Sequence, residues 1–364
     1  MKKLATYYVF NEALTPLSEV EKPLPPLNDG ELLVGIRYTT LCGSDLHTYC
    51  GLRNEPCPTI LGHEIVGVIE ALSSGHSGLD AQGHPLHIGD LITWTVFASD
   101  PNTSSYQPEI PQKNENLYKY GHRQISDQDT FHGGLATHII LRPHTCIRVL
   151  PKDIDLAVAA TINCAVATAA GALRLADSIT GKNVHIAGMG LLGLVTVAMC
   201  REWGANEVIV SDINPDRLQL AKSFGASHTV DLGESESRCV LQTFSIDRFI
   251  DMSGSPNAME LGFETLGLHG CAVLVGAVFN QRKTGIDAEK VIRKMLTIKG
   301  LHNYNYTDFF TAVDFIVENG QKYPFASLIE REFPLAEVNE ALEYATTHKP
   351  IRAGLFINPT TEQI

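Results

Sequence analysis

The sequence predicts an α/β protein with two domains, one built on a doubly wound parallel sheet and one composed mostly of β-strands. Three observations predict this fold class. The chain has 364 residues, more than one hydrophobic core usually supports. After Pro151, segments typical of strands alternate with segments typical of helices, as in βαβ units. Before Pro151, β-rich segments are separated by clusters of Gly, Pro, Asn and Asp.

The N-terminal part is predicted to hold the mostly-β domain. β-branched residues mix with apolar and polar alternation in three segments, which are expected to be strands: 31–43, 63–72 and 89–98. Residues 98–131 are polar and show little periodicity. A loop of this length inside a compact domain is usually functional or specially braced.

The C-terminal part is predicted to hold the parallel sheet. Residues 154–176 are rich in alanine and indicate a helix. Strands of the sheet are expected at 184–187 and 207–212, in a short segment ending at Leu232, and at 247–254 and 270–277, which residues 296–301 follow. Two amphipathic helices (307–320 and 335–348) and a strand (352–358) follow, in a tail too short to be a domain alone. We therefore expect one domain over 1–163 and 300–364, and the other over 164–299.

Composition and net charge limit the classes of partner and the location expected for this protein. The formal net charge of −13 argues against nucleic acid or an anionic membrane as a partner. The N-terminus lacks an apolar stretch of signal-peptide length, and no run of about 18 apolar residues predicts a membrane span. A cytoplasmic location is expected. The eight cysteines form no C-x-x-C pair, so most are expected to be reduced residues of the core.

Glycines after the first strand of the sheet indicate a dinucleotide site. Gly188, Gly190 and Gly193 have the G-x-G-x-x-G spacing of the Rossmann fold, between a strand and a helix. Asp212 ends the next strand, nineteen residues after Gly193, where a carboxylate binds ribose hydroxyls. Because a carboxylate repels a 2′-phosphate, NAD is favoured over NADP. The alternative is a structural glycine turn with a capping aspartate.

A cluster of polar residues lies in the first domain. Cys42 and His63, with Glu64 beside it, offer a thiolate and an imidazole from neighbouring loops. Catalytic zinc takes three ligands of these types and keeps one position open. The alternative for each residue alone is a buried cysteine or a histidine with ordinary hydrogen bonds. The combination with a dinucleotide fold favours the metal site.

Four motifs carry a resemblance to a known family. The sequences CGSDLH (42–47), GHEIVGVIE (62–70), GGLATHIIL (133–141) and GMGLLG (188–193) resemble the zinc-dependent alcohol dehydrogenases of the medium-chain dehydrogenase/reductase superfamily. The resemblance spans nearly the whole chain in the same order. It implies a GroES-like catalytic domain beside the Rossmann domain, and hydride transfer between a small alcohol, aldehyde or ketone and NAD.

The resemblance also implies roles around the metal. Cys42, His63 and Cys164 match the family's three zinc ligands. Glu64 is similar to the carboxylate that lies beside the metal and joins its ligands during exchange. Asp45 resembles the carboxylate that orients the ligand histidine.

Further roles follow for proton transfer and cofactor binding. Ser44 matches the hydroxyl that takes the alcohol proton, and His47 the end of the relay to solvent. Arg217 and Arg352 resemble residues that contact the adenosine ribose region and the pyrophosphate.

The chain departs from the family at the structural zinc. Many relatives bind a second zinc through C-x2-C-x2-C-x7-C, and the corresponding positions here are Asp100, Thr103, Tyr106 and Asn114. No cysteine occurs between residues 58 and 145. We expect one catalytic zinc and no structural zinc, with the lobe held by other packing or mobile.

The substrate pocket gives a weaker pattern. Residues 111–122 resemble a stretch in a subgroup associated with phosphonate metabolism, and Arg53, Lys119, His122 and Arg123 could gather around an anion. The alternative is a solvated loop with ordinary charges.

Alternatives for the whole protein also stay open. They are a metal-free NADPH-dependent quinone or enone reductase and a non-catalytic binding protein on the same fold. The family forms dimers and tetramers, and by analogy residues 270–279 are interpreted as an edge strand of a homo-oligomer.

Overall fold

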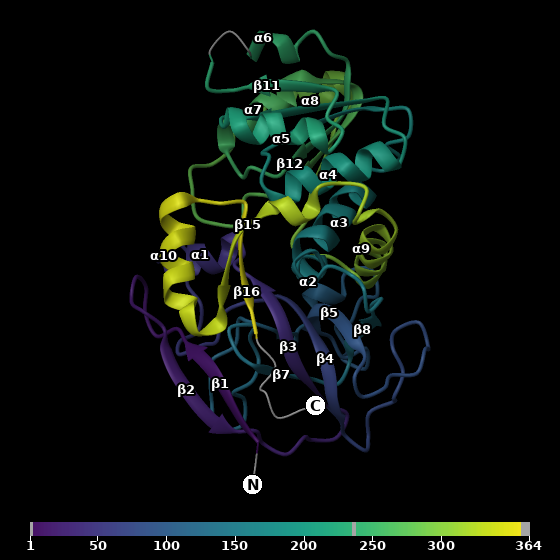
Figure 1. The fold of residues 1–364 in the computed structure, drawn as a ribbon. Coiled ribbons are helices and arrows are strands. Elements are labelled where there is room, and N and C mark those ends of the chain that lie inside the picture. Colours follow the sequence, from purple (N-terminus) through teal and green to yellow (C-terminus); the bar gives the residue numbers. More distant parts are fainter. Residues whose placement is uncertain (1–2, 235–237, 358–364) are drawn as a thin grey trace. The chain divides into compact units, whose positions relative to one another are not determined.

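The computed structural model describes residues 3–234 and 238–357 (Figure 1). The chain forms two compact units. The first unit extends to Cys164 and includes Asn305–Gly320 and the chain from Phe325 onward; the second comprises Ala165–Tyr304 and Gln321–Pro324. We predicted boundaries at 163/164 and 299/300, so Cys164 lies on the other side of its predicted boundary. It belongs to the same unit as Cys42 and His63.

The first unit is organised around one mixed sheet. Among the described residues its strand order is β15 (Ile329–Pro334), β16 (Arg352–Phe356), β3 (Leu32–Thr40), β4 (Glu64–Leu72), β5 (Leu91–Ala98) and β6 (Tyr118–Lys119), with β7 (His138–Leu141) on β3 and β8 (Thr145–Val149) on β5. β1 (Leu4–Val9) and β2 (Ser18–Pro23) form an antiparallel ribbon. The tail supplies α9 (Tyr306–Asn319), α10 (Val338–His348), β15 and β16 to this unit.

The pairing of β3 with β4 determines where the polar cluster forms. The two strands are antiparallel and lie side by side (Figure 1). Thr40 at the end of β3 lies opposite Glu64 at the start of β4. Residues that follow β3 therefore lie beside residues that precede β4. This brings Cys42 and His63 together at the same end of the two strands. Buried residues such as Val34, Ile36 and Ile65 hold the two strands in register.

The predicted helix over 154–176 is wrong as a single element. The structure has α2 (Leu156–Ala160), a π-helical turn at Ile162–Val166 and α3 (Ala167–Leu175). The π-helical turn carries Cys164. Such turns often occur at functional sites, because the extra residue re-aims a side chain that a regular helix would point elsewhere. Alanine content predicts the helices but not this local change.

The second unit confirms the predicted doubly wound parallel sheet. The strand order is β11 (His228–Asp231), β10 (Glu207–Asp212), β9 (Asn183–Ala187), β12 (Ile246–Asp251), β13 (Leu266–Leu274) and β14 (Thr297–Gly300), all parallel. The connecting helices are α4 (Leu191–Glu202), α5 (Pro215–Ser223), α6 (Arg238–Leu241), α7 (Pro256–Thr265) and α8 (Ala288–Lys294). The strand order reverses between β9 and β12, where such folds bind nucleotides.

The interpretation of residues 270–279 as an edge strand is wrong. β13 pairs with β12 on one side and with β14 on the other, so β14 is the outer strand of the sheet. β14 has only four residues, and a strand this short gives a weak pattern in sequence. In the described part of the chain, no helix has the length and apolar character needed to cross a membrane.

Candidate active site

The first ligand candidate, Cys42, begins a short helix. It is the N-cap residue of α1 (Gly43–Tyr49), and its own N–H donates to Asp45 Oδ2 at 3.0 Å. This reciprocal cap fixes the backbone of Cys42 relative to the helix. The Cys42 side chain is buried, which is the position expected for a ligand cysteine rather than an exposed thiol.

Asp45 also fixes the second candidate, His63. Its Oδ1 lies 3.1 Å from His63 Nδ1 and accepts the N–H of Gly62 at 3.2 Å. Asp45 is only 1% exposed, so these contacts satisfy a buried carboxylate. With Nδ1 held by Asp45, Nε2 of His63 is the nitrogen left for a ligand. This is how a carboxylate orients a metal-binding histidine.

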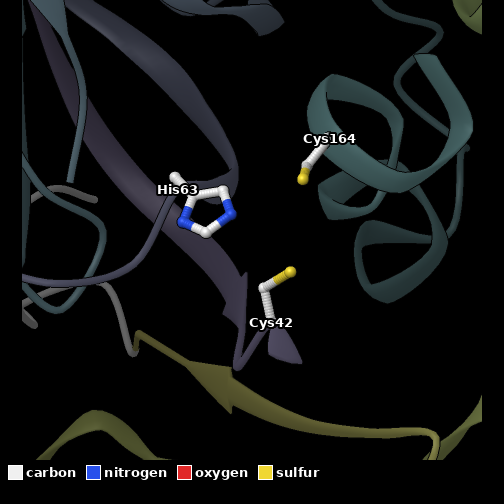
Figure 2. Close-up of side chains that lie close together, drawn as sticks. All are labelled: Cys42, His63 and Cys164. Carbon is white, nitrogen blue, oxygen red and sulfur yellow. The ribbon is translucent and has the colours of Figure 1, made fainter. Parts of the chain in front are cut away.

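The third candidate, Cys164, completes the cluster. One ligand atom each from Cys42, His63 and Cys164 lies within 4.8 Å of the others. Figure 2 shows both sulfur atoms and the imidazole edge directed toward the space between them, from three different segments. Two thiolates and one imidazole are a typical ligand set for catalytic zinc, and a fourth position stays open. The residues present therefore fit a zinc ion.

The protonation of the cluster also favours a cation. A hydrogen bond from Cys164 holds the pKa of Cys42 well below its usual range. Arg352 and His63 lower this pKa further, and together these groups outweigh burial, which raises it. The hydrogen bond to Cys42, together with burial, raises the pKa of Cys164. Burial lowers the pKa of His63, but Asp45 and Cys42 outweigh it and raise that pKa to about 10. Zinc binding must displace these protons, so zinc affinity falls as the pH is lowered.

Glu64 lies behind the cluster rather than in it. It is fully buried, and its carboxylate accepts from Arg352 Nε at 2.8 Å, from Arg352 Nη2 at 3.0 Å and from Thr40 Oγ1. Arg352 Nη2 also lies 3.7 Å from Cys42 Sγ. The predicted exchange role of Glu64 and the predicted pyrophosphate contact of Arg352 stay predictions, since in this structure each side chain is engaged with the other.

The two predicted proton-transfer residues lie on α1. Ser44 Oγ lies 3.3 Å from His63 Nε2, beside the proposed metal position. His47 is three residues further along the helix and therefore near the same helix face. Burial lowers the pKa of His47, which keeps the imidazole neutral near pH 7 and able to accept a proton. Helix α1 thus carries Ser44, which contacts His63, and His47, which lies within electrostatic range of Cys42.

The lobe that holds the structural zinc in many relatives is held here by hydrogen bonds. Asn114 is buried, and its Nδ2 donates to the Asp100 carbonyl at 3.0 Å. Its Oδ1 accepts from Ser105 Oγ at 3.2 Å and from the Glu115 N–H at 2.9 Å. Backbone turns link Thr103 to Asp100 and Tyr106 to Thr103. An amide side chain thus joins both ends of the lobe.

The glycine turn of the second unit has the geometry that each position requires. Gly188 has a φ of +94°, and a Cβ there would lie 2.7 Å from the backbone of Ser253. A Cβ on Gly193 would lie 1.9 Å from the Gly188 carbonyl oxygen. A Cβ on Gly190 would meet nothing within 4 Å, so that glycine leaves open space. The first and third glycines are needed by the fold, and the second leaves the backbone accessible.

A pocket of about 390 Å³ opens beside this turn at the carboxyl ends of β9, β10 and β12. Its lining includes Gly188, Gly190, Asp212 and Arg217. Asp212 accepts the Met189 N–H at 2.6 Å and the Asn214 N–H at 2.9 Å. The carboxylate therefore braces the turn and also faces the pocket.

Of the four basic residues predicted to gather around an anion, three come together, and burial holds the pKa of one of them, His122, well below its usual range. Arg53 Nη2 and His122 Nδ1 both contact Glu55 Oε1, at 2.7 and 2.9 Å, and Lys119 lies within electrostatic range. Arg123 does not join them, because it lies beside Asp129 and over the Tyr118 ring. Sequence reasoning missed Glu55. A carboxylate two residues after Arg53 is the only local signal for it.

Comparison with known proteins places these features in a family. A family model described as alcohol dehydrogenase GroES-like domain matches residues 28–152, and one described as zinc-binding dehydrogenase matches residues 192–318. The chain belongs to the zinc-dependent alcohol dehydrogenase family of the medium-chain dehydrogenase/reductase superfamily. The predicted family, the GroES-like and Rossmann folds and the assignment as an alcohol oxidoreductase are confirmed.

Individual relatives in this family have different substrates. The chain is 26% identical over 338 residues to an L-threonine 3-dehydrogenase of Idiomarina loihiensis, covering 90% of this chain and 92% of the relative. It is 27% identical over 353 residues to a 5-exo-hydroxycamphor dehydrogenase of Pseudomonas putida, covering 94% of each. A crystal structure of an alcohol dehydrogenase from Thermotoga maritima superposes with a TM-score of 0.91 at 29% identity, covering 98% of this chain and all of that one.

Replacing Asp45 by asparagine is expected to weaken zinc binding by about 10–100-fold, since the carboxylate holds the ligand histidine in place. Asparagine retains the size of the side chain and one oxygen, which can still accept the Cys42 N–H at the helix start while the bond to Gly62 is lost. Zinc affinity, measured by competition with a chromophoric chelator, checks this. The exposed Asp153→Asn change in the same unit is the control. Equal zinc affinity in the two variants would show that Asp45 does not position His63.

Proposed function

We propose that this zinc-dependent alcohol dehydrogenase uses NAD and oxidises a small alcohol at the cluster of Cys42, His63 and Cys164, or reduces the corresponding carbonyl compound. The observation that carries the proposal is the convergence of these three side chains, with Ser44 Oγ 3.3 Å from His63 Nε2. Two thiolates and one imidazole hold zinc with an open position, where zinc, when bound, supplies a Lewis acid for the alcohol oxygen.

The chain's own residues supply positioning and proton transfer. Asp45 holds the His63 ring so that Nε2 faces the ligand position. Ser44, as a general base relay, accepts the alcohol proton at Oγ, and His47 receives the proton at its imidazole near the end of α1. The relay passes through a cofactor hydroxyl, as the family resemblance implies. Hydride transfer itself belongs to the nicotinamide.

The cofactor assignment rests on the second unit. The glycine turn at the start of α4 directs backbone N–H groups toward the pyrophosphate position, and the helix N-terminus favours negative charge. Asp212, at the end of β10, lines the same pocket. A carboxylate there accepts ribose hydroxyls and repels a 2′-phosphate. These features support NAD over NADP, and Arg217 in the same pocket supports a contact with the adenosine ribose.

Replacing Asp212 by asparagine is expected to lower the preference for NAD over NADP by at least about tenfold, because like-charge repulsion costs several kcal/mol. Asparagine keeps an oxygen for only one of the two N–H groups, since Met189 donates to Oδ2 and Asn214 to Oδ1, so thermal unfolding of the variant is measured alongside. The ratio of kcat/KM for the two cofactors checks this, with the exposed Asp216→Asn as the control. An unchanged ratio in the Asp212 variant would reject Asp212 as the selecting residue.

Activity screening tests the proposed function. The full chain, loaded with zinc, is assayed by the absorbance of reduced nicotinamide over short alcohols, polyols and hydroxyalkyl phosphonates, with and without a chelator. Chelator-sensitive oxidation with NAD supports the proposal. Chelator-insensitive reduction of quinones or enones with NADPH would instead identify the metal-free reductase, and no turnover of any substrate would favour a non-catalytic protein. The phosphonates in the panel test the predicted subgroup.

We also propose that the protein forms homodimers or homotetramers. β14 is the outer strand of the second unit's sheet, and Leu268, Ile292 and Met295 near it are exposed at 79%, 75% and 69%. Exposed apolar residues beside an open strand edge favour pairing with another copy. A mass of one chain by light scattering would reject this.

A further inference from the structure

Lys119 occupies an unusual electrostatic position in the first unit. Its side chain is partly buried, and its ammonium makes no ion pair and no hydrogen bond with any residue that the structure describes. Burial, with Arg53 as the next cause, lowers the pKa of Lys119 to about 8. A cation held in this way favours an anion that the chain itself does not supply.

The backbone places Lys119 beside the metal cluster. Lys119 lies opposite Phe97 where β6 pairs with β5, and Gly121 follows two residues later. Gly121 has a φ of +73°, and a Cβ there would lie 2.6 Å from the Gly62 carbonyl oxygen and 3.3 Å from His63 Cβ. Only glycine allows this approach. The segment that carries Lys119 therefore runs against the segment that carries the ligand His63.

His122 continues this contact. Its ring centroid lies 5.1 Å from that of His63, and its Nδ1 lies 2.9 Å from Glu55 Oε1. Glu55 also binds Arg53 Nη2 at 2.7 Å. Arg53 is tied to the relay helix, because its N–H donates to the His47 carbonyl at 3.2 Å. His122 thus contacts the ligand candidate His63, Glu55 links His122 to Arg53, and Lys119 lies within electrostatic range of Cys164.

The positive charges near Lys119 outnumber the negative charges. Glu55 is a carboxylate beside these residues, and its Oε1 already contacts Arg53 Nη2 and His122 Nδ1, although burial and Lys119 hold the pKa of His122 well below its usual range. Lys113 adds a further positive charge near Lys119. Cys164 also lies near Lys119, but its raised pKa favours the neutral thiol without metal, and a bound zinc ion would offset the two thiolates of the cluster. With zinc in place, Lys119 retains a positive charge without a counter-ion.

We propose that Lys119, supported by Arg53, binds an anionic group on the alcohol substrate, so that the enzyme acts on hydroxy acids rather than on neutral alcohols. The inference rests on the proposed function, because it names the substrate class of that site. The ammonium donates hydrogen bonds to a terminal carboxylate or phosphonate, while the hydroxyl of the same molecule reaches the open metal position. Both kinds of anion offer oxygens that accept charge-assisted hydrogen bonds.

A pH dependence follows from the same cluster. The charged or titratable groups around Lys119 are Arg53, Lys113, Glu55, Cys164 and His122, whose own pKa is lowered by burial and by Lys119. Because the ammonium must be protonated to bind an anion, and burial lowers the pKa of Lys119, affinity for the anion falls as the pH rises through that lowered pKa. Below that pKa the bound anion favours the protonated form. A neutral alcohol shows no such loss from Lys119.

The test measures binding and turnover separately. Calorimetry on the full chain uses ethylphosphonate and propanoate, which lack a hydroxyl and cannot react. Steady-state assays compare 2-hydroxyethylphosphonate, 3-hydroxypropanoate and propan-1-ol. For Lys119→Met we expect about 10–100-fold weaker binding of the preferred anion and a KM for its hydroxy acid raised by a similar factor, with kcat nearly unchanged. The exposed Lys152→Met is the matched control.

Each outcome bears on a different statement. Anion binding that depends on Lys119 but not on Lys152 supports the inference, and the tighter of the two probes identifies carboxylate or phosphonate. No binding of either anion, or equal binding by wild type and Lys119→Met, overturns it. Oxidation of propan-1-ol without anion binding would leave the proposed function standing and remove only the anion site. Lys119-dependent anion binding without oxidation of any alcohol would support the anion site and reject the proposed function.

Discussion

The Cys42→Ala variant is expected to lose zinc and nearly all turnover. The thiolate of Cys42 is one of the three ligands, and no other cysteine or histidine in the described part of the chain joins the cluster. A Lewis acid contributes several kcal/mol to the transition state, so kcat/KM should fall by at least about a thousandfold. Binding of NAD should be retained, because the glycine turn and Asp212 belong to the second unit.

Zinc per chain by elemental analysis, kcat/KM and NAD affinity together check this prediction. The matched control is Cys239→Ala, since Cys239 is exposed and far along the chain. Loss of NAD binding in the Cys42 variant would indicate misfolding rather than loss of a ligand. Turnover that survives in a zinc-free Cys42→Ala enzyme would contradict the role assigned to zinc.

Replacing Gly193 or Gly190 by alanine should have opposite effects on stability and cofactor affinity. In Gly193→Ala, the new Cβ would lie 1.9 Å from the Gly188 carbonyl oxygen and 3.0 Å from Met189 Cε. The backbone oxygen cannot move without separating α4 from β9, so the free energy of unfolding of the second unit should fall by about 1–3 kcal/mol or more. In Gly190→Ala, the Cβ meets open space, and the φ of −77° suits alanine.

Gly190→Ala should therefore keep its stability and lose cofactor affinity, because the methyl group occupies the position where the backbone meets the pyrophosphate. Thermal unfolding of each variant and calorimetric titration with NAD separate the two effects. If Gly190→Ala binds NAD as tightly as wild type, the turn does not cradle the pyrophosphate. If Gly193→Ala is as stable as wild type, close helix–strand packing is not its role.

The cofactor turn could be predicted because each of its requirements is local. A strand, three glycines, a helix and an acidic residue lie within 29 residues, from Val184 to Asp212. The pairing of Cys42 with His63 is nearly as local, because the antiparallel strands β3 and β4 bring their ends together. Cys164 is different. It lies 101 residues after His63, and only the family resemblance indicated it.

Other features depend on tertiary contacts that no local pattern shows. Glu64 and Arg352 are 288 residues apart, yet their buried ion pair lies beside Cys42. The sequence shows that the lobe lacks cysteines. It does not show that Asn114 links the lobe, because this depends on the Asp100 carbonyl and the Ser105 hydroxyl lying beside it. The π-helical turn at Cys164 follows from the packing of α2 and α3 rather than from alanine content. The register of β3 and β4 is not readable from alternation either, because most residues of both strands are buried and two bulges interrupt the pairing.

Zinc K-edge X-ray absorption on the full chain, combined with the zinc content, tests the central claim most directly. The claim is that Cys42, His63 and Cys164 meet around one ion. We predict one zinc per chain, with two sulfur ligands at about 2.3 Å and one imidazole nitrogen at about 2.0–2.1 Å. One sulfur should be lost when Cys164 is replaced by serine. A zinc bound only by oxygen and nitrogen, or an active enzyme that holds no metal, would contradict the account.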